Sequence, residues 1–323
     1  MPLSPRRPDH GWACLALLLA TVIWALSFPF IKTVLQIQQG LAPEGGSWFW
    51  AALLVMMRFG LAGLVLLAWC GRTLRTTTRS EVWQGCGLGV FGGLGLLLQV
   101  DGLAYTEAST SAFITQLYVI LIPLWDALWH RRRPSVWVWT SASLVLIGLA
   151  ILARFDWRAL KLGRGEFETV LSALFFTAQI LWLDRPRFAG NRVALFTLMM
   201  FGVTALLFLP LFLATLPELA TLPRAYASGT VAGLMLALTL GCTLFCYSMM
   251  NRWQPRVTPT EAGLIYAVEP LFASFYALFL PAWLSGLAGI HYANETLTPR
   301  LLVGGGLITI ANVLVQWRAV RKS

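Results

Sequence analysis

The sequence predicts an all-α integral membrane protein with ten transmembrane helices, built as two inverted five-helix repeats. Three observations carry this prediction: an apolar composition, ten continuous apolar runs, and a similarity between the two halves of the chain. Of the 323 residues, 58% are hydrophobic and only 12% are charged. A soluble domain usually carries about 25% charged residues. Lipid rather than water must therefore surround most of this chain.

The apolar runs are the direct signal for membrane-spanning helices, since a helix needs about 20 such residues to cross a bilayer. They are continuous rather than alternating, which favours helices over barrel strands. The first run lacks a small-residue cleavage signal, so we interpret it as a helix and not a signal peptide. The ten predicted spans are 12–32, 48–70, 82–104, 108–130, 136–153, 167–183, 193–215, 227–250, 260–284 and 301–317.

The distribution of basic residues predicts the orientation of these spans. If the N-terminus is cytoplasmic, sixteen of the 24 Lys and Arg residues fall on the inner side and seven on the outer side. Such a bias is typical of cytoplasmic loops. We therefore expect both termini in the cytoplasm, with the protein in the bacterial inner (plasma) membrane. Because the basic residues lie in short gaps between apolar runs, the net charge of +10 does not indicate a nucleic-acid partner.

Two stretches indicate an internal repeat. The fourth span contains "QLYVILIPLW" with Pro123, and the ninth contains "YAVEPLFA" with Pro270. Each is followed by a polar turn and a Gly-rich final helix. The predicted units are residues 1–160 and 161–323, and an odd number of spans per unit inverts the second one. Inverted repeats are typical of carriers that bind substrate at the repeat interface. The alternative is that apolar helices resemble one another by composition alone.

Ionisable residues within spans are costly and are candidates for function. Arg58 and Glu269 each lie about a dozen residues from the ends of their spans, too deep for the side chain to reach the interface. We expect them to form a polar centre between the repeats, either as a direct pair or separately. A purely structural pairing is the alternative. Asp101 and Glu107 lie at the outer end of a helical hairpin, where we expect them to be hydrated.

Further polar and aromatic residues could line a cavity for a small organic molecule, although each alone is more often a packing residue. These candidates are Trp24, Ser27, Gln99, Thr115, Gln116, Tyr118, Gln179 and Tyr266. Pro123 and Pro270 each remove a helical hydrogen-bond donor, which suits either a hinge or an ordinary packing kink. The stretch "GLGVFGGLGLLL" follows no strand, so we interpret it as close helix packing and not a phosphate loop.

Four motifs, in order along the chain, resemble the EamA family of the drug/metabolite transporter superfamily. They are "TVIWALSFPFIK", "RFGLAGLVLL", "LQVDGLAYTEASTSAFITQLYVILIPL" and "VEPLFAS". The resemblance implies a ten-helix carrier of two inverted repeats that commonly exports amino acids, metabolites or toxic small molecules. Three features depart from the family pattern. Ala25 follows Trp24 where glycine is usual, Glu107 stands where a small polar residue is common, and "PAWLSGLAGIHYA" is inserted before "NETL".

The sequence therefore predicts a secondary transporter that moves a small organic metabolite by alternating access. No Walker motif is present, so the sequence does not indicate ATP as the direct driving force. Three possibilities stay open: coupling to protons through Glu269, substrate exchange, and uncoupled transport. A channel or a structural membrane protein is the alternative. Three scattered histidines (His10, His130 and His291) do not favour an enzyme. The expected partners are a small-molecule substrate and the lipid bilayer. The sequence indicates no cofactor, metal or oligomeric state.

Overall fold

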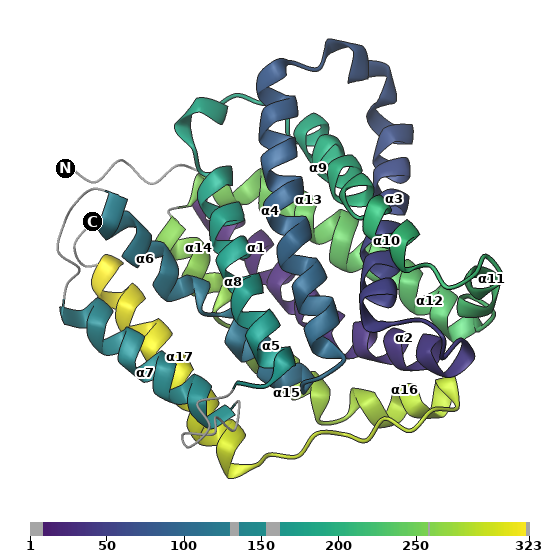
Figure 1. Ribbon diagram of the computed structural model, residues 1–323. Coiled ribbons are helices and arrows are strands. Elements are labelled where there is room, and N and C mark those ends of the chain that lie inside the picture. The colour runs from purple at the N-terminus through teal and green to yellow at the C-terminus, as the bar shows by residue number, and fades with distance from the viewer. Residues whose placement is uncertain (1–8, 130–135, 153–161, 258, 321–323) are drawn as a thin grey trace.

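A computed structural model describes residues 9–129, 136–152, 162–257 and 259–320. The described residues form helices, turns and loops, and no strand occurs among them. Figure 1 shows the longer helices packed side by side in one bundle, as the sequence predicts for a membrane protein. Several basic residues that enter the predicted orientation, including Arg6, Arg7 and Arg131–Arg133, lie outside the described residues, so the orientation stays a prediction.

The described residues of the first half form seven α-helices, and two of the predicted spans are each divided between two helices. Predicted span 1 comprises α1 and α2, and span 4 comprises α5 and α6. The helices are α1 (His10–Ala25), α2 (Ser27–Leu41), α3 (Ser47–Cys70), α4 (Arg79–Leu103), α5 (Ala108–Thr115), α6 (Tyr118–Trp129) and α7 (Val136–Leu152).

The second half is divided more finely. Its helices are α8 (Arg164–Leu183), α9 (Val193–Leu207), α10 (Leu209–Thr215), α11 (Thr221–Ala225), α12 (Gly229–Ala237), α13 (Cys246–Trp253), α14 (Pro259–Tyr266), α15 (Glu269–Ala277), α16 (Leu280–Ala288) and α17 (Pro299–Val320). A π-helical segment, Leu238–Phe245, joins α12 to α13. The predicted ninth span thus becomes α14 and α15, and much of the inserted segment that follows it is the helix α16.

Seven helical stretches among the described residues are long and apolar enough to cross a membrane. The count is eight if α15 and α16, which meet at a bend of 53°, form one span. The predicted fifth and tenth spans correspond to shorter apolar helices, Trp139–Leu152 and Pro299–Leu314. The structure therefore confirms an all-helical membrane fold, while the total of ten spans and the inverted repeat stay predictions.

The glycine-rich helix α4 packs closely against its neighbours. A Cβ atom added at Gly89 would lie 2.8 Å from the carbonyl oxygen of Met200 in α9. One added at Gly102 would lie 2.9 Å from the carbonyl oxygen of Gly165 in α8. Because only glycine permits such close approach of backbones, "GLGVFGGLGLLL" is a helix-packing stretch, as predicted.

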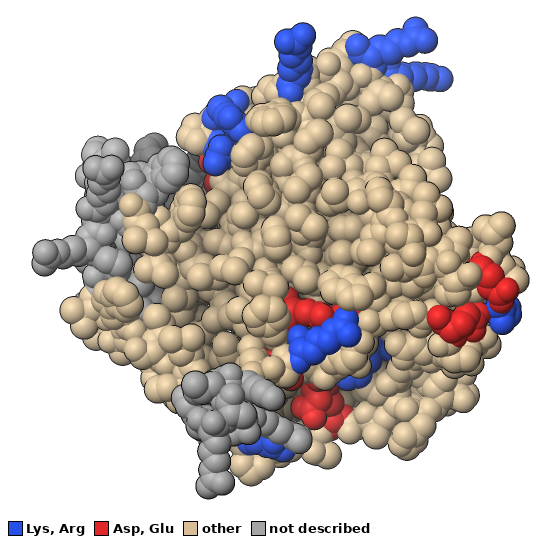
Figure 2. Space-filling model, viewed as in Figure 1, with Lys and Arg blue, Asp and Glu red and all other residues tan. Residues whose placement is uncertain are grey.

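Ion pairs lie at the ends of the helices. Arg164 at the start of α8 contacts Asp101 of α4 at 2.5 Å and Glu168 at 2.8 Å. At the other end of α4, Glu81 contacts Arg192 at 2.7 Å. The expectation that Asp101 is hydrated is wrong, since it is buried and paired with Arg164, whereas Glu107 is exposed. Figure 2 shows charged side chains at the top and in the lower part of the molecule, with an uncharged band between them.

Candidate functional site

Two helices are interrupted at the centre of the bundle. The break between α5 and α6 falls at residues 116–117, and the break between α14 and α15 falls at residues 267–268. Around both, the backbone makes short-range bonds typical of a 3₁₀ turn: Leu117 N–H donates to the Ile114 carbonyl at 3.0 Å, and Leu271 N–H to the Val268 carbonyl at 3.1 Å. Breaks of this kind are tolerated at membrane depth where they line a cavity.

The two prolines relate differently to these breaks. Pro270 lies in the first turn of α15, where a missing N–H breaks no helical bond. Pro123 lies inside α6, well past the first break. The two prolines therefore do not occupy equivalent places relative to the breaks, and a hinge role for either of them stays a prediction. In the first half the break precedes the proline. There the tight turn at Gln116 and Leu117 interrupts the helix, and Tyr118, not Pro123, opens the next one.

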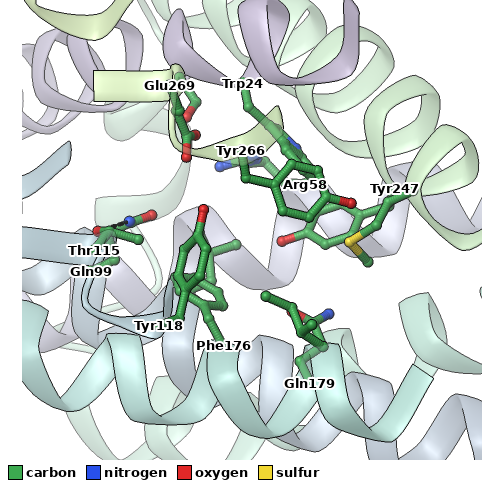
Figure 3. Close-up of a pocket in the computed structure, with 14 residues that line it drawn as sticks. Trp24, Arg58, Gln99, Thr115, Tyr118, Phe176, Gln179, Tyr247, Tyr266 and Glu269 are labelled. Atoms are coloured by element: carbon green, nitrogen blue, oxygen red, sulfur yellow. Dashed lines mark hydrogen bonds between the residues drawn. The ribbon is translucent and has the colours of Figure 1, made fainter. Parts of the chain in front are cut away.

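A pocket lies between these breaks, and both halves of the chain contribute to it (Figure 3). It contains nine of the ten residues that the sequence analysis singles out for the cavity or the polar centre, and Gln116 is the one that does not line it. The lining residues are Trp24, Ser27, Arg58, Leu96, Gln99, Thr115, Tyr118, Phe176, Gln179, Ile180, Tyr247, Met250, Tyr266 and Glu269. Apolar and aromatic walls with a few convergent polar groups are typical of small-molecule sites. The role of these residues in binding stays a prediction.

Arg58 reaches the pocket from the middle of α3 and is only 2% exposed. Its Nε donates to the hydroxyl of Thr243 at 3.0 Å, and that hydroxyl donates to the Leu238 carbonyl at 2.9 Å. Thr243 and Leu238 are five residues apart in the π-helical segment, and such segments often occur at functional sites. The Nη1 atom of Arg58 is buried and has no hydrogen-bond partner among the described residues. The hydrogen bond at Nε thus orients the guanidinium, while Nη1 remains available to donate to a ligand.

Aromatic rings form the wall beside Arg58. The Trp24 indole packs edge-on against Tyr247 at 5.2 Å and Tyr266 at 6.0 Å between ring centroids. Its Nε1 donates to the carbonyl of Cys242 at 2.8 Å. Since Cys242 also belongs to the π-helical segment, that segment orients both Trp24 and Arg58.

Glu269, the first residue of α15, brings a carboxyl group to the opposite part of the pocket. Gln116 Nε2 donates to Glu269 Oε2 at 3.3 Å, so the residues at the two helix breaks are joined. Figure 3 shows the carboxyl group of Glu269 and the hydroxyl of Tyr118 pointing toward one another. Nearby, Gln99 Nε2 donates to the Thr115 hydroxyl at 2.9 Å. The polar groups of α4, α5 and α15 therefore converge on one side of the pocket.

Arg58 and Glu269 line the same pocket but bind different partners, Thr243 and Gln116. No ion pair joins them in the part of the chain that the structure describes. The sequence leaves open whether Arg58 and Glu269 form a direct pair or lie apart, and in the structure they lie apart. A pocket with two separated groups of opposite charge character can contact two parts of one ligand.

Five lining residues were missed by the sequence reasoning: Leu96, Phe176, Ile180, Tyr247 and Met250. All are apolar or aromatic, so they resemble ordinary membrane residues. The available signal was helical spacing from a chosen polar residue. Phe176 lies three residues before Gln179 on α8, and Leu96 lies three residues before Gln99 on α4. Ile180 is adjacent to Gln179 and shares a face instead with Phe176, four residues earlier.

The all-helical bundle of long apolar helices defines a polytopic membrane protein with a pocket between its helices. Comparison with known proteins agrees: residues 11–154 match the EamA-like transporter family. The first half of the chain therefore matches the family that the motifs resemble, the EamA family of the drug/metabolite transporter superfamily.

Two further proteins are similar over most of the chain. An uncharacterized transporter of Archaeoglobus fulgidus is 24% identical over 308 residues, covering 95% of this chain and 86% of that protein. A crystal structure of a protein matches with a TM-score of 0.60 and 17% identity, covering 97% of this chain and 99% of the other, and shows likeness of fold alone. Both the matched family and this relative are described as transporters.

Proposed function

We propose that this protein is a secondary transporter that carries a small organic molecule across the membrane by alternating access. The carrying observation is one pocket, lined from both halves of the chain, at the meeting point of two broken helices. Broken helices at a repeat interface are the usual substrate site of secondary transporters. In this proposal the bundle of one half rocks against the other and exposes the pocket to each side in turn.

The proposal includes ten spans in two inverted units, residues 1–160 and 161–323. The corresponding breaks support it, since α5–α6 and α14–α15 occupy the fourth position of each unit and both open onto the pocket. The two short apolar helices, Trp139–Leu152 and Pro299–Leu314, would be the fifth spans of the two units. From the resemblance and the basic residues, we infer export across the bacterial inner membrane, with both termini cytoplasmic.

The chemistry of the pocket favours a substrate with an acidic and a basic group, such as an amino acid or a similar metabolite. Arg58 offers a buried guanidinium nitrogen that has no hydrogen-bond partner among the residues that the structure describes, which suits a carboxylate. Glu269 can accept from an ammonium group, and the faces of Tyr118 and Tyr266 can contact a cation or an apolar side chain. A molecule that contacts both Arg58 and Glu269 would balance the charge of each, although the two side chains form no ion pair with one another.

Glu269 is also the residue that could couple transport to protons. The Glu269 carboxylate is partly buried, and its only hydrogen bond in the described part of the chain comes from the Gln116 amide. Such a charge is costly within a membrane span, and a proton or a bound cation would lower that cost. Proton release would then accompany substrate binding. Glu269→Gln retains a hydrogen-bonding side chain of the same size but cannot exchange a proton, so transport by this variant should lose its dependence on pH.

Reconstituted protein in proteoliposomes tests the proposal. A labelled amino acid or metabolite, chosen by a screen of cells with and without the protein, should show saturable counterflow. Arg58→Gln and Glu269→Gln should reduce it at least about tenfold, which corresponds to the loss of one charged hydrogen bond. The exposed residues Arg75 and Glu218 provide matched controls, Arg75→Gln and Glu218→Gln. Flux without counterflow or saturation would indicate a channel instead.

A further inference from the structure

A second groove lies at the end of the bundle where α4 begins, away from the central pocket. It is formed by the start of α4 and by the 3₁₀ turn Pro186–Phe188 that follows α8. Its lining residues are Thr77, Arg79, Ser80, Val82, Trp83, Arg187 and Phe188. None of them takes part in the proposed transport site. The set combines two cations, two hydroxyl groups and an apolar wall.

The charge of this groove is not balanced by the protein. In the described part of the chain, neither Arg79 nor Arg187 forms an ion pair, and no acidic residue lines the groove. The nearest acidic residue in sequence, Glu81, is fully engaged. It accepts from Arg192 Nε at 2.7 Å and Nη2 at 2.9 Å, and from the Thr78 N–H at 2.7 Å. Two guanidinium groups therefore remain available to an external anion.

Arg187 is held in place by aromatic rings. Its guanidinium lies 4.7 Å from the ring centroid of Trp182 and 4.6 Å from that of Phe188. A stacked guanidinium keeps its edge free for bidentate hydrogen bonds to phosphate oxygens. Stacking also reduces the conformational freedom that would be lost on binding. The position of Arg187 thus favours recognition of a phosphate group over loose attraction of counterions.

The remaining wall of the groove is apolar and exposed. Trp83 is 58% exposed and Val82 is 38% exposed, and both belong to the first turns of a membrane-spanning helix. Tryptophan at this depth is typical of the interface between headgroups and acyl chains. A soluble phosphate would leave this wall uncovered, whereas a phospholipid would cover it with its glycerol backbone and upper acyl chain.

We propose that the groove between the start of α4 and the Pro186–Phe188 turn binds the phosphate headgroup of an anionic phospholipid. Arg79 and Arg187 contact the phosphate, and Val82 and Trp83 contact the apolar part of the lipid. Basic pockets between membrane helices are known to select anionic headgroups. The lipid joins α4 to the turn after α8, so its binding should stabilise the packing of these two helices.

Purified full-length protein in nanodiscs tests this site. The probe is phosphatidylglycerol, added to phosphatidylcholine discs and compared with phosphatidylcholine alone. Native mass spectrometry measures lipid affinity, and the thermal unfolding midpoint measures stability. Wild-type protein should retain phosphatidylglycerol and unfold at a higher temperature when it is present. Arg79→Gln with Arg187→Gln should weaken lipid binding about 25-fold, from about fivefold per arginine, and abolish the stabilisation.

A charge-matched double variant, Arg72→Gln with Arg75→Gln, controls for general attraction at the same end of the molecule. Both residues are exposed on the preceding 3₁₀ turn and lie outside the groove. This variant should bind phosphatidylglycerol as the wild type does, and Arg79→Lys with Arg187→Lys should retain most of the affinity. Equal loss in both glutamine pairs, or no loss in the groove variant, would overturn the proposal. If inorganic phosphate raised the unfolding midpoint as much as phosphatidylglycerol does, the ligand would be a phosphate ion and not a phospholipid, which would overturn the proposal.

Discussion

Gln116 and Glu269 join the two broken helices of the chain across the central pocket. The amide of Gln116, at the end of α5, donates to the carboxyl group of Glu269, at the start of α15, over 3.3 Å. In the proposed transport cycle the two halves move relative to one another, so this hydrogen bond has to form and break. It is therefore the most direct structural link between the packing of the helices and the proposed transport function.

Gln116→Leu tests this link. The substitution removes the donor and leaves the partly buried carboxyl group of Glu269 without this hydrogen bond, which costs about 1–3 kcal/mol. We expect a lower thermal unfolding midpoint and a reduced rate of counterflow. Gln179→Leu is a matched control in the same pocket, because the side-chain nitrogen of Gln179 has no partner among the described residues. An equal loss of stability in the two variants would contradict the proposed link.

Residue chemistry explains why the polar part of the pocket could be predicted. An arginine and a glutamate placed mid-span must find polar surroundings, and neighbours at helical spacing share a face with them. The helix breaks could not be read from the prolines in the same way. Pro123 continues its helix, while Gln116, an ordinary polar residue in the sequence, lies at the tight turn.

Partners from distant parts of the chain also escaped prediction. Asp101 looks like a hydrated residue at a helix end, but Arg164 lies across from it because α8 packs against α4. Thr243, in the π-helical segment, contacts Arg58 of α3, which lies 185 residues earlier in the chain. Both contacts depend on which helices become neighbours, and hydropathy does not determine that.

Asp184 should make stability depend on pH. It follows the last residue of α8, and burial raises its pKa from the ordinary value of 3.8 to about 7, although a hydrogen bond from Gln254 at 3.3 Å opposes the shift. The folded protein therefore binds this proton more tightly than the unfolded chain. The contribution of the protonated Asp184 carboxyl to stability is therefore complete below about pH 4 and is lost as the pH rises to about 7.

Asp184→Asn should remove this dependence while keeping an acceptor for Gln254. Each unit of pKa difference corresponds to about 1.4 kcal/mol, and Arg185, Arg252 and Arg256, which line the same cleft, would reduce the total. We expect the variant to unfold at a higher temperature than the wild type at pH 8 and at a similar temperature at pH 4. Thermal unfolding in detergent measures both. Glu218→Gln, at an exposed carboxyl group, should show no such difference.

The contact between α7 and α17 depends on two glycines. A Cβ atom at Gly304 would lie 2.8 Å from Leu152 Cγ and 2.9 Å from the carbonyl oxygen of Gly148. Figure 1 shows the two helices side by side at the edge of the bundle. Gly304→Ala should therefore push them apart and cost about 1–3 kcal/mol. Gly306→Ala is the control, since a Cβ atom there meets nothing within 4 Å. Equal unfolding midpoints of the two variants would contradict this packing.

Thr243 should act on the substrate through Arg58. Its hydroxyl accepts from Arg58 Nε and donates to the Leu238 carbonyl, so it sets the direction of the guanidinium within the pocket. Thr243→Val keeps the volume but removes the acceptor, and we expect the Michaelis constant for an acidic substrate to rise about tenfold, the equivalent of one hydrogen bond to a charged group. Thr243→Ser retains the hydroxyl and should restore most of the affinity.

Thr239→Val separates this positioning role from a general effect on the π-helical segment. Thr239 is buried in the same segment, and its hydroxyl has no hydrogen-bond partner among the described residues. Its substitution should leave the Michaelis constant unchanged. Concentration-dependent uptake into proteoliposomes distinguishes the variants. If Thr243→Val lowers only the maximal rate, or if Thr239→Val raises the Michaelis constant equally, then Thr243 supports the helix and does not orient Arg58.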